Sequence, residues 1–340
     1  MRSFELLYGE GKTVDLCLSA FSYEEHGKKV ITLNANNEPI ISKVETYYKY
    51  LGRDLSDTIG DELLLEKAIR YNEKGFSAIF VDNAHLLSVN DVEQLFLISL
   101  IYNIRVVCYT NRVDTEGAIR CWELANIIKR VDASNGRNSD DVTFIYGAMD
   151  SCKTSSLLIK ADVLERRKGK QIITIKPKLD RTEEYIKSRV GIKRKADLVI
   201  DNTKPLTIPN LKGLDTILVD EAQFLSPDII ESLTEKCKTN GIHIIFYGLK
   251  SDFRTQSFPG SKKLFLLSDQ LIKLDTVCGC TNFVEFNART VNDRYVYEGD
   301  QFVVDNGGEI AYHSLCANCY VRDVWRLPIN DHKALVKRYM

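Results

Sequence analysis

The sequence has no long apolar run. Nowhere does it approach the roughly 20 consecutive apolar residues of a membrane-spanning helix, and its first residues lack the apolar segment of a secretion signal. It also lacks an excess of charge, because 46 basic residues balance 47 acidic ones to a formal net charge of −1. That balance excludes a strong positive electrostatic field over the whole protein that would attract nucleic acid or an anionic membrane. A local patch of basic residues is still possible. We therefore expect a cytoplasmic protein without nucleic-acid or membrane partners.

Proline is scarce too, with 7 among 340 residues, and a composition of 44% hydrophobic and 27% charged residues is that of an ordinary globular protein. The length suffices for two domains with substantial cores. Cysteine, in contrast, occurs 9 times. Because disulfides are rare in the cytoplasm, these thiols are expected to be metal ligands or buried core residues.

The chain resembles itself at an offset of about 140 residues. The matching segments keep their order in both halves and read GKKVITL against GKQIITI, IFVDNAHL against ILVDEAQF, and VVCYT against IIFYG. Two unrelated α/β domains could share such strand compositions, but several ordered matches favour a duplication. The matched ranges are 27–33 and 169–175, 79–86 and 217–224, and 106–110 and 244–248.

In each half, short β-branched runs alternate with segments long enough for helices. This pattern predicts a parallel sheet covered by helices on both faces. A polar, turn-rich stretch, DASNGRNSDD at 132–141, separates the halves as a linker would. In the second half we expect strands near 142–146, 171–175, 198–200, 215–219 and 243–247, and helices near 153–168, 182–190, 226–239 and 260–269.

The first candidate for chemistry is the stretch GAMDSCKT at 147–154. It follows a predicted strand and opens a predicted helix, as phosphate loops do, so that backbone N–H groups and the helix N-terminus face phosphate oxygens. Lys153 would reach the β- and γ-phosphates, and the hydroxyl of Thr154 would hold Mg²⁺. Cys152 stands where the motif has glycine, and such a string alone is more often chance than function.

A second acidic motif supports the phosphate loop. The apolar strand ending in Asp220-Glu221 would place two carboxylates at the C-terminal edge of the same parallel sheet. Taken alone, the pair could equally be an acidic helix cap after a buried strand. With a phosphate loop on the same sheet, we favour Asp220 as a partner of the Mg²⁺ shell and Glu221 as the acceptor of a proton.

Four cysteines form two close pairs near the end of the chain, Cys278-Gly279-Cys280 and Cys316-Ala317-Asn318-Cys319. Two such pairs predict a closed, structural zinc site, and the alternative of buried thiols requires two tight pairs by accident. Four further cysteines lie in apolar runs and are predicted to be core residues, namely Cys17, Cys108, Cys121 and Cys237.

Together these motifs resemble the type II thymidine kinases, cellular and bacterial enzymes with a P-loop domain and a zinc-bearing lasso domain. The resemblance spans residues 142–320. Its most specific segments are VDEAQFL at 219–225, YGLKSDFRTQSFPGSKKL at 247–264 and YHSLCANC at 312–319. It implies an enzyme that phosphorylates the 5′-hydroxyl of thymidine or deoxyuridine with ATP and Mg²⁺, making dTMP by salvage.

The fold expected from the repeat and the resemblance is α/β, with two tandem P-loop-type parallel-sheet domains and a small zinc-binding lasso domain after the second. The predicted boundaries are a degenerate kinase-like domain at 1–133, a linker at 134–141, a catalytic domain at 142–275, and the lasso domain with the C-terminal tail at 276–340.

The resemblance also implies roles for residues. Glu221 would be the general base, and the lasso at 298–308 would close over the nucleoside. Each apolar residue of the implied base pocket would by itself be ordinary core, and only their joint placement favours a pocket. The residues implied to bind ATP are Gly147, Ala148, Met149, Asp150, Ser151, Cys152, Lys153, Thr154, Asp220 and Gln223, and of these Thr154 and Asp220 would also bind Mg²⁺. The residues implied to surround the base are Met149, Phe224, Leu249, Phe253 and Tyr312. The residues implied to bind zinc are Cys278, Cys280, Cys316 and Cys319.

The first half resembles a copy without the chemistry. Residues 9–13 keep Gly-Lys-Thr, but the loop is too short to wrap a β-phosphate. At the second motif Asp82 remains while Asn83 replaces the glutamate, and asparagine cannot take up a proton. Because the family forms tetramers, two chains with two copies each would make a pseudo-tetrameric homodimer. The family also implies feedback inhibition by dTTP.

Two other functions stay open at this point. A catalytically silent nucleotide-binding or regulatory protein derived from the kinase is favoured by the altered phosphate loop and disfavoured by the Asp220-Glu221 pair. A P-loop ATPase acting on nucleic acid is disfavoured by the neutral charge and the absence of an evident basic track.

Overall fold

The structure is a computed structural model in which the chain divides into two compact units. The first unit comprises residues 1–136 and 321–340, and the second unit comprises residues 137–320. The domain boundaries inferred from the sequence stay predictions. The residues described are 3–8, 16, 19–20, 23, 28–35, 56–58, 64–130, 141–179, 184–208, 211–301, 303 and 309–327.

Several predicted features therefore lie outside the described residues. They include the short Gly-Lys-Thr loop of the first half, most of the linker and part of the lasso. The residues concerned are 9–13, Cys17, 134–140, Phe302, 304–308 and the tail from 328 onwards.

The second unit is built on a six-stranded sheet in which all neighbouring strands are parallel, in the order β11-β8-β12-β13-β7-β14. The middle strands β7, β12 and β13 are almost entirely buried, as expected for β-branched and aromatic runs covered on both faces. The bounds are β7 Val142–Tyr146, β8 Ile172–Pro177, β11 Leu198–Ile200, β12 Thr216–Val219, β13 His243–Gly248 and β14 Gln270–Lys273.

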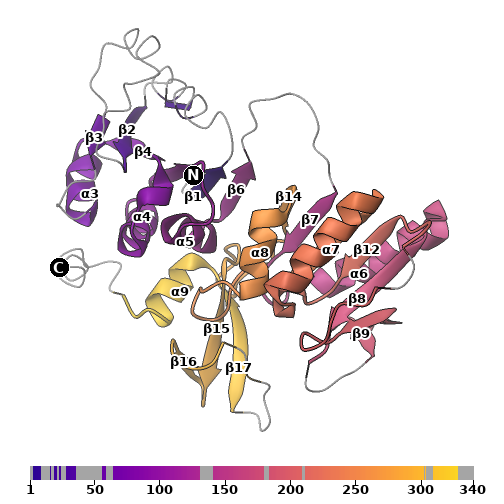
Figure 1. The fold of residues 1–340 in the computed structure, drawn as a ribbon. Helices are drawn as coiled ribbons and strands as arrows, with labels where there is room; N and C mark the ends of the chain where they lie inside the picture. The colour runs from indigo at the N-terminus through magenta and orange to yellow at the C-terminus, as the bar shows by residue number, and fades with distance from the viewer. Residues whose placement is uncertain are drawn as a thin grey trace. The chain divides into compact units, whose positions relative to one another are not determined.

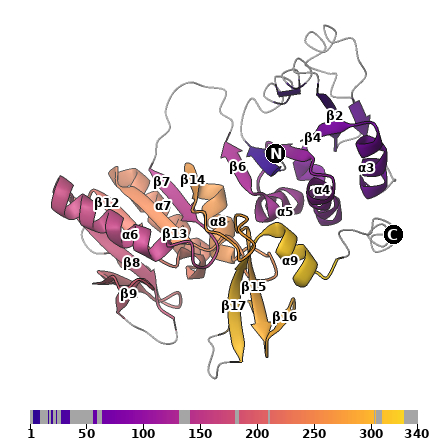
Figure 2. The same ribbon diagram turned by 180° about the vertical axis from the view of Figure 1, so that it is seen from behind.

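Helices cover both faces of this sheet, with α6 on one face and α7 and α8 on the other (Figures 1 and 2). Helix α6, Lys153–Asp162, continues as a π-helical turn, Val163–Arg167. Helix α7, Pro227–Asn240, starts where the side chain of Ser226 accepts a hydrogen bond from the backbone of Ile229, and it ends at Gly241 with φ 64°. Helix α8 is Pro259–Leu267.

The helix predicted over 182–190 is wrong. Within it, Tyr185–Lys187 forms strand β9, which pairs antiparallel with β10, Lys193–Lys195. Ile186 is buried between two exposed neighbours, a period of two that fits a strand and not a helix. Gly191, at φ 90°, lies in the turn between the two strands.

A three-stranded antiparallel sheet, in the order β16-β15-β17, follows the large sheet in the chain. We call its two longer strands the β15–β17 ribbon. Their register places Asn287 opposite Ser314 and Arg289 opposite Tyr312. The bounds are β15 Phe286–Val291, β16 Arg294–Val296 and β17 Ile310–Leu315, and helix α9 follows at Ala317–Asp323.

The first unit contains a second six-stranded parallel sheet, in the order β3-β2-β4-β5-β1-β6. The spatial order of the strands is the same as in the second unit when the strands of each sheet are counted along the chain. In this count β1, β2, β3, β4, β5 and β6 correspond to β7, β8, β11, β12, β13 and β14. It is the topology expected of a duplicated domain. The bounds are β1 Ser3–Tyr8, β2 Lys29–Asn34, β3 Ser56–Thr58, β4 Phe76–Asp82, β5 Arg105–Thr110 and β6 Ile127–Arg130, with helices α3 Leu64–Glu73, α4 Val89–Ile101 and α5 Glu116–Leu124.

Two parallel sheets in a mixed α/β protein confirm the predicted fold class. Among the cysteines predicted to be core residues, Cys108, Cys121 and Cys237 are buried. In the part of the chain that the structure describes, no helix has the length and apolarity to cross a membrane.

Candidate active site

A cavity of about 430 Å³ opens in the second unit at the C-terminal edge of the large sheet. Most of the predicted site residues line it, which brings the phosphate loop, the acidic motif and the apolar residues into one space. These residues are Met149, Asp150, Cys152, Lys153, Thr154, Glu221, Gln223, Phe224, Leu249, Phe253 and Tyr312.

The side chain of Lys153 forms hydrogen bonds with the phosphate loop to which it belongs. The Nζ of Lys153 lies 2.6 Å from the carbonyl oxygen of Ala148 and 3.3 Å from both the carbonyl oxygen of Gly147 and the hydroxyl of Ser151. Burial lowers the pKa of Lys153, and the carboxylates of Glu221 and Asp220 oppose that shift. Three acceptors thus hold a buried ammonium group where an anionic ligand would meet it.

Gly147 has a steric reason to be glycine. A Cβ at this position would collide with the side chain of Ser151 and lie 2.8 Å from the carbonyl oxygen of Leu274. The position therefore admits no side chain without movement of the backbone next to it. Gly147, Ala148 and the buried Ser151 belong to the loop but are not among the residues that line the cavity.

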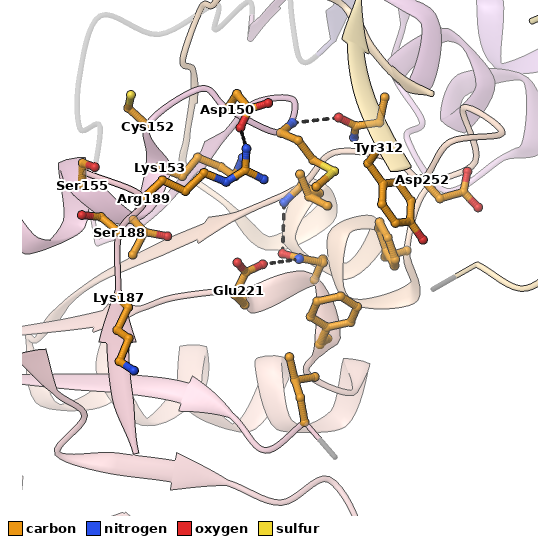
Figure 3. Close-up of a pocket in the computed structure, with 18 of the residues that line it drawn as sticks. Asp150, Cys152, Lys153, Ser155, Lys187, Ser188, Arg189, Glu221, Asp252 and Tyr312 are labelled. Carbon is orange, nitrogen blue, oxygen red and sulfur yellow. Dashed lines mark hydrogen bonds and ion pairs between the residues drawn. The ribbon is translucent and has the colours of Figure 1, made fainter. Parts of the chain in front are cut away.

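Two other loop residues have a left-handed backbone. Asp150 has φ 64° and Cys152 has φ 58°, a region that costs a residue with a side chain about 1–2 kcal/mol. The thiol of Cys152 is exposed, so the missing glycine changes strain more than packing. The carboxylate of Asp150 forms an ion pair with Arg189 (Figure 3), which gives this negative charge a partner beside the loop.

Thr154 connects the loop to the acidic motif. Its hydroxyl lies 3.3 Å from each carboxylate oxygen of Asp220, at the end of β12. Burial and then the neighbouring carboxylate of Glu221 raise the pKa of Asp220 to about 7, against the stabilising hydrogen bonds and the charge of Lys153. A hydroxyl beside a carboxylate is a donor set that suits Mg²⁺, and a bound cation would favour the charged form of Asp220.

Glu221 is held by Gln223. The Nε2 of Gln223 donates to the Glu221 carboxylate at 2.6 Å, while the Oε1 of Gln223 accepts from the backbone N–H of Leu249 at 3.0 Å. Glu221 has φ 50° and precedes a 3₁₀ turn, η3 at Ala222–Phe224. In the view of Figure 3, Lys153 and Ser155 lie on one side and Tyr312 and Asp252 on the other, with Glu221 between them. The carboxylate therefore lies between the phosphate loop and the aromatic part of the cavity.

The aromatic part of the cavity is made of flat side chains from several segments. The rings of Phe224 and Phe258 meet edge to face with centroids 5.5 Å apart. Phe253 is 1% exposed, and the hydroxyl of Tyr312 lies 3.4 Å from the carbonyl oxygen of Val303 in the lasso. Such walls suit a flat, uncharged ring with a few polar atoms at its edge.

Sequence reasoning gave no role to several residues that line the cavity. Asp252 lies in the segment at 247–264 that carries the family resemblance, so the signal was present but no role was read from it, while Ser188 and Arg189 lie within the range of the resemblance but outside its most specific segments. Gln301 belongs to the lasso that was expected to close over the nucleoside, but it was given no role of its own, whereas Asn287 had no signal because only the folded β15–β17 ribbon brings it here. The remaining ones are Ser155, Leu179, Lys187, Val190 and Phe258.

The four paired cysteines converge within the second unit. Their sulfur atoms all lie within 4.8 Å of one another, and Cys280 Sγ is 3.4 Å from Cys316 Sγ and 3.6 Å from Cys319 Sγ. Sulfur atoms bound tetrahedrally to zinc at about 2.3 Å are roughly 3.8 Å apart. A hydrogen bond from the backbone of Asn282 leads the interactions that lower the pKa of Cys280 to about 6. The cluster could therefore bind zinc.

Comparisons with known proteins identify the family. The thymidine kinase family model matches residues 140–320 of the 340. The chain belongs to the thymidine kinase family. It is an ATP-dependent kinase, and the predicted resemblance is confirmed. Residues 1–139 lie outside the family-model match.

Individual thymidine kinases match nearly along their whole length. That of Lactiplantibacillus plantarum is 36% identical over 182 residues, which are 52% of this chain and 93% of the relative. That of Enterobacteria phage T4 is 34% identical over 180 residues, 51% of this chain and 91% of the relative. That of Encephalitozoon cuniculi is 34% identical over 183 residues, 53% of this chain and 86% of the relative. The match therefore corresponds to almost one complete thymidine kinase within a longer chain.

Proposed function

We propose that the second unit transfers the γ-phosphate of ATP to the 5′-hydroxyl of thymidine or deoxyuridine. The observation that carries this proposal is the shared cavity, in which Lys153 and Glu221 lie with the aromatic walls. A phosphate-binding loop, a carboxylate and a flat apolar site in one cavity suit phosphoryl transfer to a nucleoside better than a motor function.

Glu221 is the general base in this proposal. It accepts the proton of the 5′-hydroxyl as that oxygen attacks the γ-phosphorus, and the bond to the β–γ bridging oxygen breaks to release ADP. Gln223 orients the carboxylate through its 2.6 Å hydrogen bond. Lys153 stabilises the negative charge of the phosphates from the loop.

Mg²⁺ and zinc complete the proposed cofactors. Thr154 and Asp220 would hold Mg²⁺, which when bound neutralises phosphate charge. The four cysteines would hold a structural zinc ion that supports the β15–β17 ribbon. Met149, Phe224, Leu249, Phe253 and Tyr312 would surround the base, with ATP on the loop side.

The decisive experiment is phosphate transfer from ATP to thymidine by the wild type and by Glu221→Gln. We expect turnover by the wild type and a rate lower by roughly 10²-fold or more in the variant, the scale for losing a general base. Equal rates would reject the role of Glu221. No turnover by the wild type, together with retained ATP binding, would favour the silent nucleotide-binding protein.

The proposal also includes an oligomeric state and feedback inhibition by dTTP. Two chains would form a homodimer with four parallel-sheet units, a pseudo-tetramer in which the first unit takes the place of a kinase subunit. The mass in solution tests this, and a monomer or a tetramer of whole chains would reject it. Feedback by dTTP would appear as inhibition of thymidine phosphorylation at fixed ATP. The cytoplasmic location stays a prediction from the sequence.

A further inference from the structure

One face of the β15–β17 ribbon contacts the segments that form both ends of the cavity. Asn287 and Arg289 are two residues apart on β15 and therefore point to the same side of the strand. Their partners across the ribbon are Ser314 and Tyr312. These four side chains form two successive cross-strand pairs.

The first pair holds the phosphate loop at Met149. The backbone N–H of Met149 donates to Asn287 Oδ1 at 2.7 Å, and its carbonyl oxygen accepts from the Ser314 hydroxyl at 2.8 Å. Asn287 is 4% exposed and also donates to the carbonyl oxygen of Ser251 at 3.0 Å. Both backbone groups of one loop residue thus depend on two facing ribbon side chains.

The second pair holds the start of the lasso, residues 298–301, and Val303. Arg289 donates to the carbonyl oxygens of Glu298 and Asp300 at 2.8 and 2.9 Å. The hydroxyl of Tyr312 lies 3.5 Å from the backbone nitrogen of Val303. Gly299, between the two accepting carbonyls, has φ 111°, and a Cβ there would lie 2.5 Å from the guanidinium of Arg289. The lasso backbone therefore fits closely around this side chain.

Arg289 also supports the aromatic wall. Its guanidinium lies 3.7 Å from the ring centroid of Phe253, a cavity residue, and the arginine is 4% exposed. Its Nε is buried and has no partner among the described residues. Burying a guanidinium group is costly unless its N–H groups are hydrogen-bonded and its charge has a partner. The carbonyl oxygens of the lasso and the ring of Phe253 provide these contacts, so the lasso and the aromatic wall are held by the same side chain.

We propose that this face of the ribbon is the positioning frame for both substrates, with Asn287 and Ser314 positioning the phosphate loop for ATP and Arg289 positioning the lasso and the base pocket for the nucleoside. All of these are positioning residues that act through Met149, Phe253 and the lasso backbone. The inference rests on the proposed function and deepens it, since it divides the ribbon between the two substrates.

The test is a KM measurement for each substrate in Ser314→Ala and Arg289→Lys. Ser314→Ala removes one hydrogen bond, so we expect the KM for ATP to rise about 3- to 10-fold and that for thymidine to stay within about 2-fold. Arg289→Lys removes the planar fork, so we expect the KM for thymidine to rise about 10-fold or more with little change for ATP. Arg294→Lys, on the exposed part of neighbouring β16, is the matched control and should change neither constant.

Structural damage is separated from positioning by two measurements. Zinc content and the thermal unfolding midpoint should stay at wild-type values in Ser314→Ala. If Arg289→Lys does not fold, Gly299→Ala replaces it, because its Cβ displaces the guanidinium from the lasso side and should raise the KM for thymidine alone. Equal changes in both KM values, or none, in a folded and zinc-loaded variant would overturn the proposal.

Failure of the proposed function would look different. In that case the wild type would not phosphorylate thymidine at all. Calorimetric titration of ATP into the wild type and Ser314→Ala would then still test the first pair, with weaker binding by the variant expected. Unchanged ATP affinity would reject it.

Discussion

The turns after β4 and β12 are the clearest comparison between the two units. Asn83 and Glu221 each follow the aspartate at the end of their strand, have φ 55° and 50°, and precede a 3₁₀ turn, η1 at Ala84–Leu86 and η3. Left-handed backbone costs glutamate about 1–2 kcal/mol, whereas asparagine tolerates it better. The first unit thus has the same turn backbone with an asparagine, which suits the conformation but cannot take up a proton as the proposed base Glu221 would. Retention of a fold does not require retention of its chemistry.

Polar side chains link equivalent elements in both units, although the residues that form the links differ. Helices α4 and α5 are joined by an ion pair between Arg120 and Glu93 at 2.7 Å, and α7 and α8 by one between Lys263 and Glu231 at 3.0 Å. Between the first and fifth strands of the sheets, Arg105 binds Glu5 in the first unit, whereas a hydrogen bond joins Thr143 and His243 in the second. The first unit has therefore kept its polar links between elements.

The largest effect is expected when the asparagine of the first unit is placed in the second. Glu221→Asn should lower kcat by about 10²-fold or more because the base is lost. Its thermal stability should stay equal or rise, since asparagine fits the left-handed backbone better. Activity assays and calorimetric unfolding of the same preparation check both parts. A variant that is both inactive and clearly less stable would contradict this reading of the turn.

The next comparison concerns two glycines at equivalent positions, each the second residue of its helix in one of the two units. A Cβ on Gly260 in α8 would lie 2.7 Å from the carbonyl oxygens of Gln223 and Leu225, and one on Gly117 in α5 would overlap the carbonyl oxygen of Leu87. Each alanine substitution should destabilise its own unit by about 1–3 kcal/mol through overpacking. Gly260→Ala should also lower activity, because η3 carries the residues next to Glu221.

Both tryptophans of the chain, Trp122 and Trp325, belong to the first unit, so tryptophan fluorescence reports its unfolding. Gly117→Ala should shift the denaturation curve seen by fluorescence and leave kcat nearly unchanged. Loss of activity equal to that of Gly260→Ala would show that the units do not differ in this respect.

A smaller effect is expected at the phosphate loop. Cys152 already has the backbone conformation that glycine adopts without strain. Cys152→Gly should therefore fold normally and lower the KM for ATP by about 2- to 5-fold, as strain leaves the loop. Cys152→Ala removes the thiol but keeps the strained Cβ, so it is the control and should show no gain. An unchanged or higher KM in the glycine variant would show that the loop tolerates its cysteine.

The smallest effect concerns pH. Burial raises the pKa of Glu5, but hydrogen bonds from Arg105 and Ser3 outweigh it and leave the pKa below its usual 4.5. Its ionised form therefore stabilises the first unit above about pH 4.5, and this stabilisation is lost as the pH falls through the lower, folded-state value. The stability difference between wild type and Glu5→Gln, followed by tryptophan fluorescence, should shrink below pH 4.5.

The sequence predicted the parts of the site that are continuous in the chain. The segments at 147–154 and 219–225 could be read because a strand, a turn and charged residues follow one another at fixed spacing. The β9–β10 hairpin was missed because a single buried residue, Ile186, carries its strand signal. The contacts of Asn287, Ser314 and Arg289 could not be predicted, since they depend on the register that pairs Asn287 with Ser314 and Arg289 with Tyr312 across the ribbon, and on a distant loop.

The central difference proposed between the two units is that the second unit binds a nucleoside and the first unit does not, so the number of nucleoside sites per chain tests it. Calorimetric titration of thymidine into the full-length protein measures this number directly. We predict one thymidine bound per chain, because among the described residues a phosphate loop, Glu221 and aromatic walls come together in the cavity of the second unit. Two equivalent sites per chain would contradict the view that the first unit has kept the fold without the chemistry.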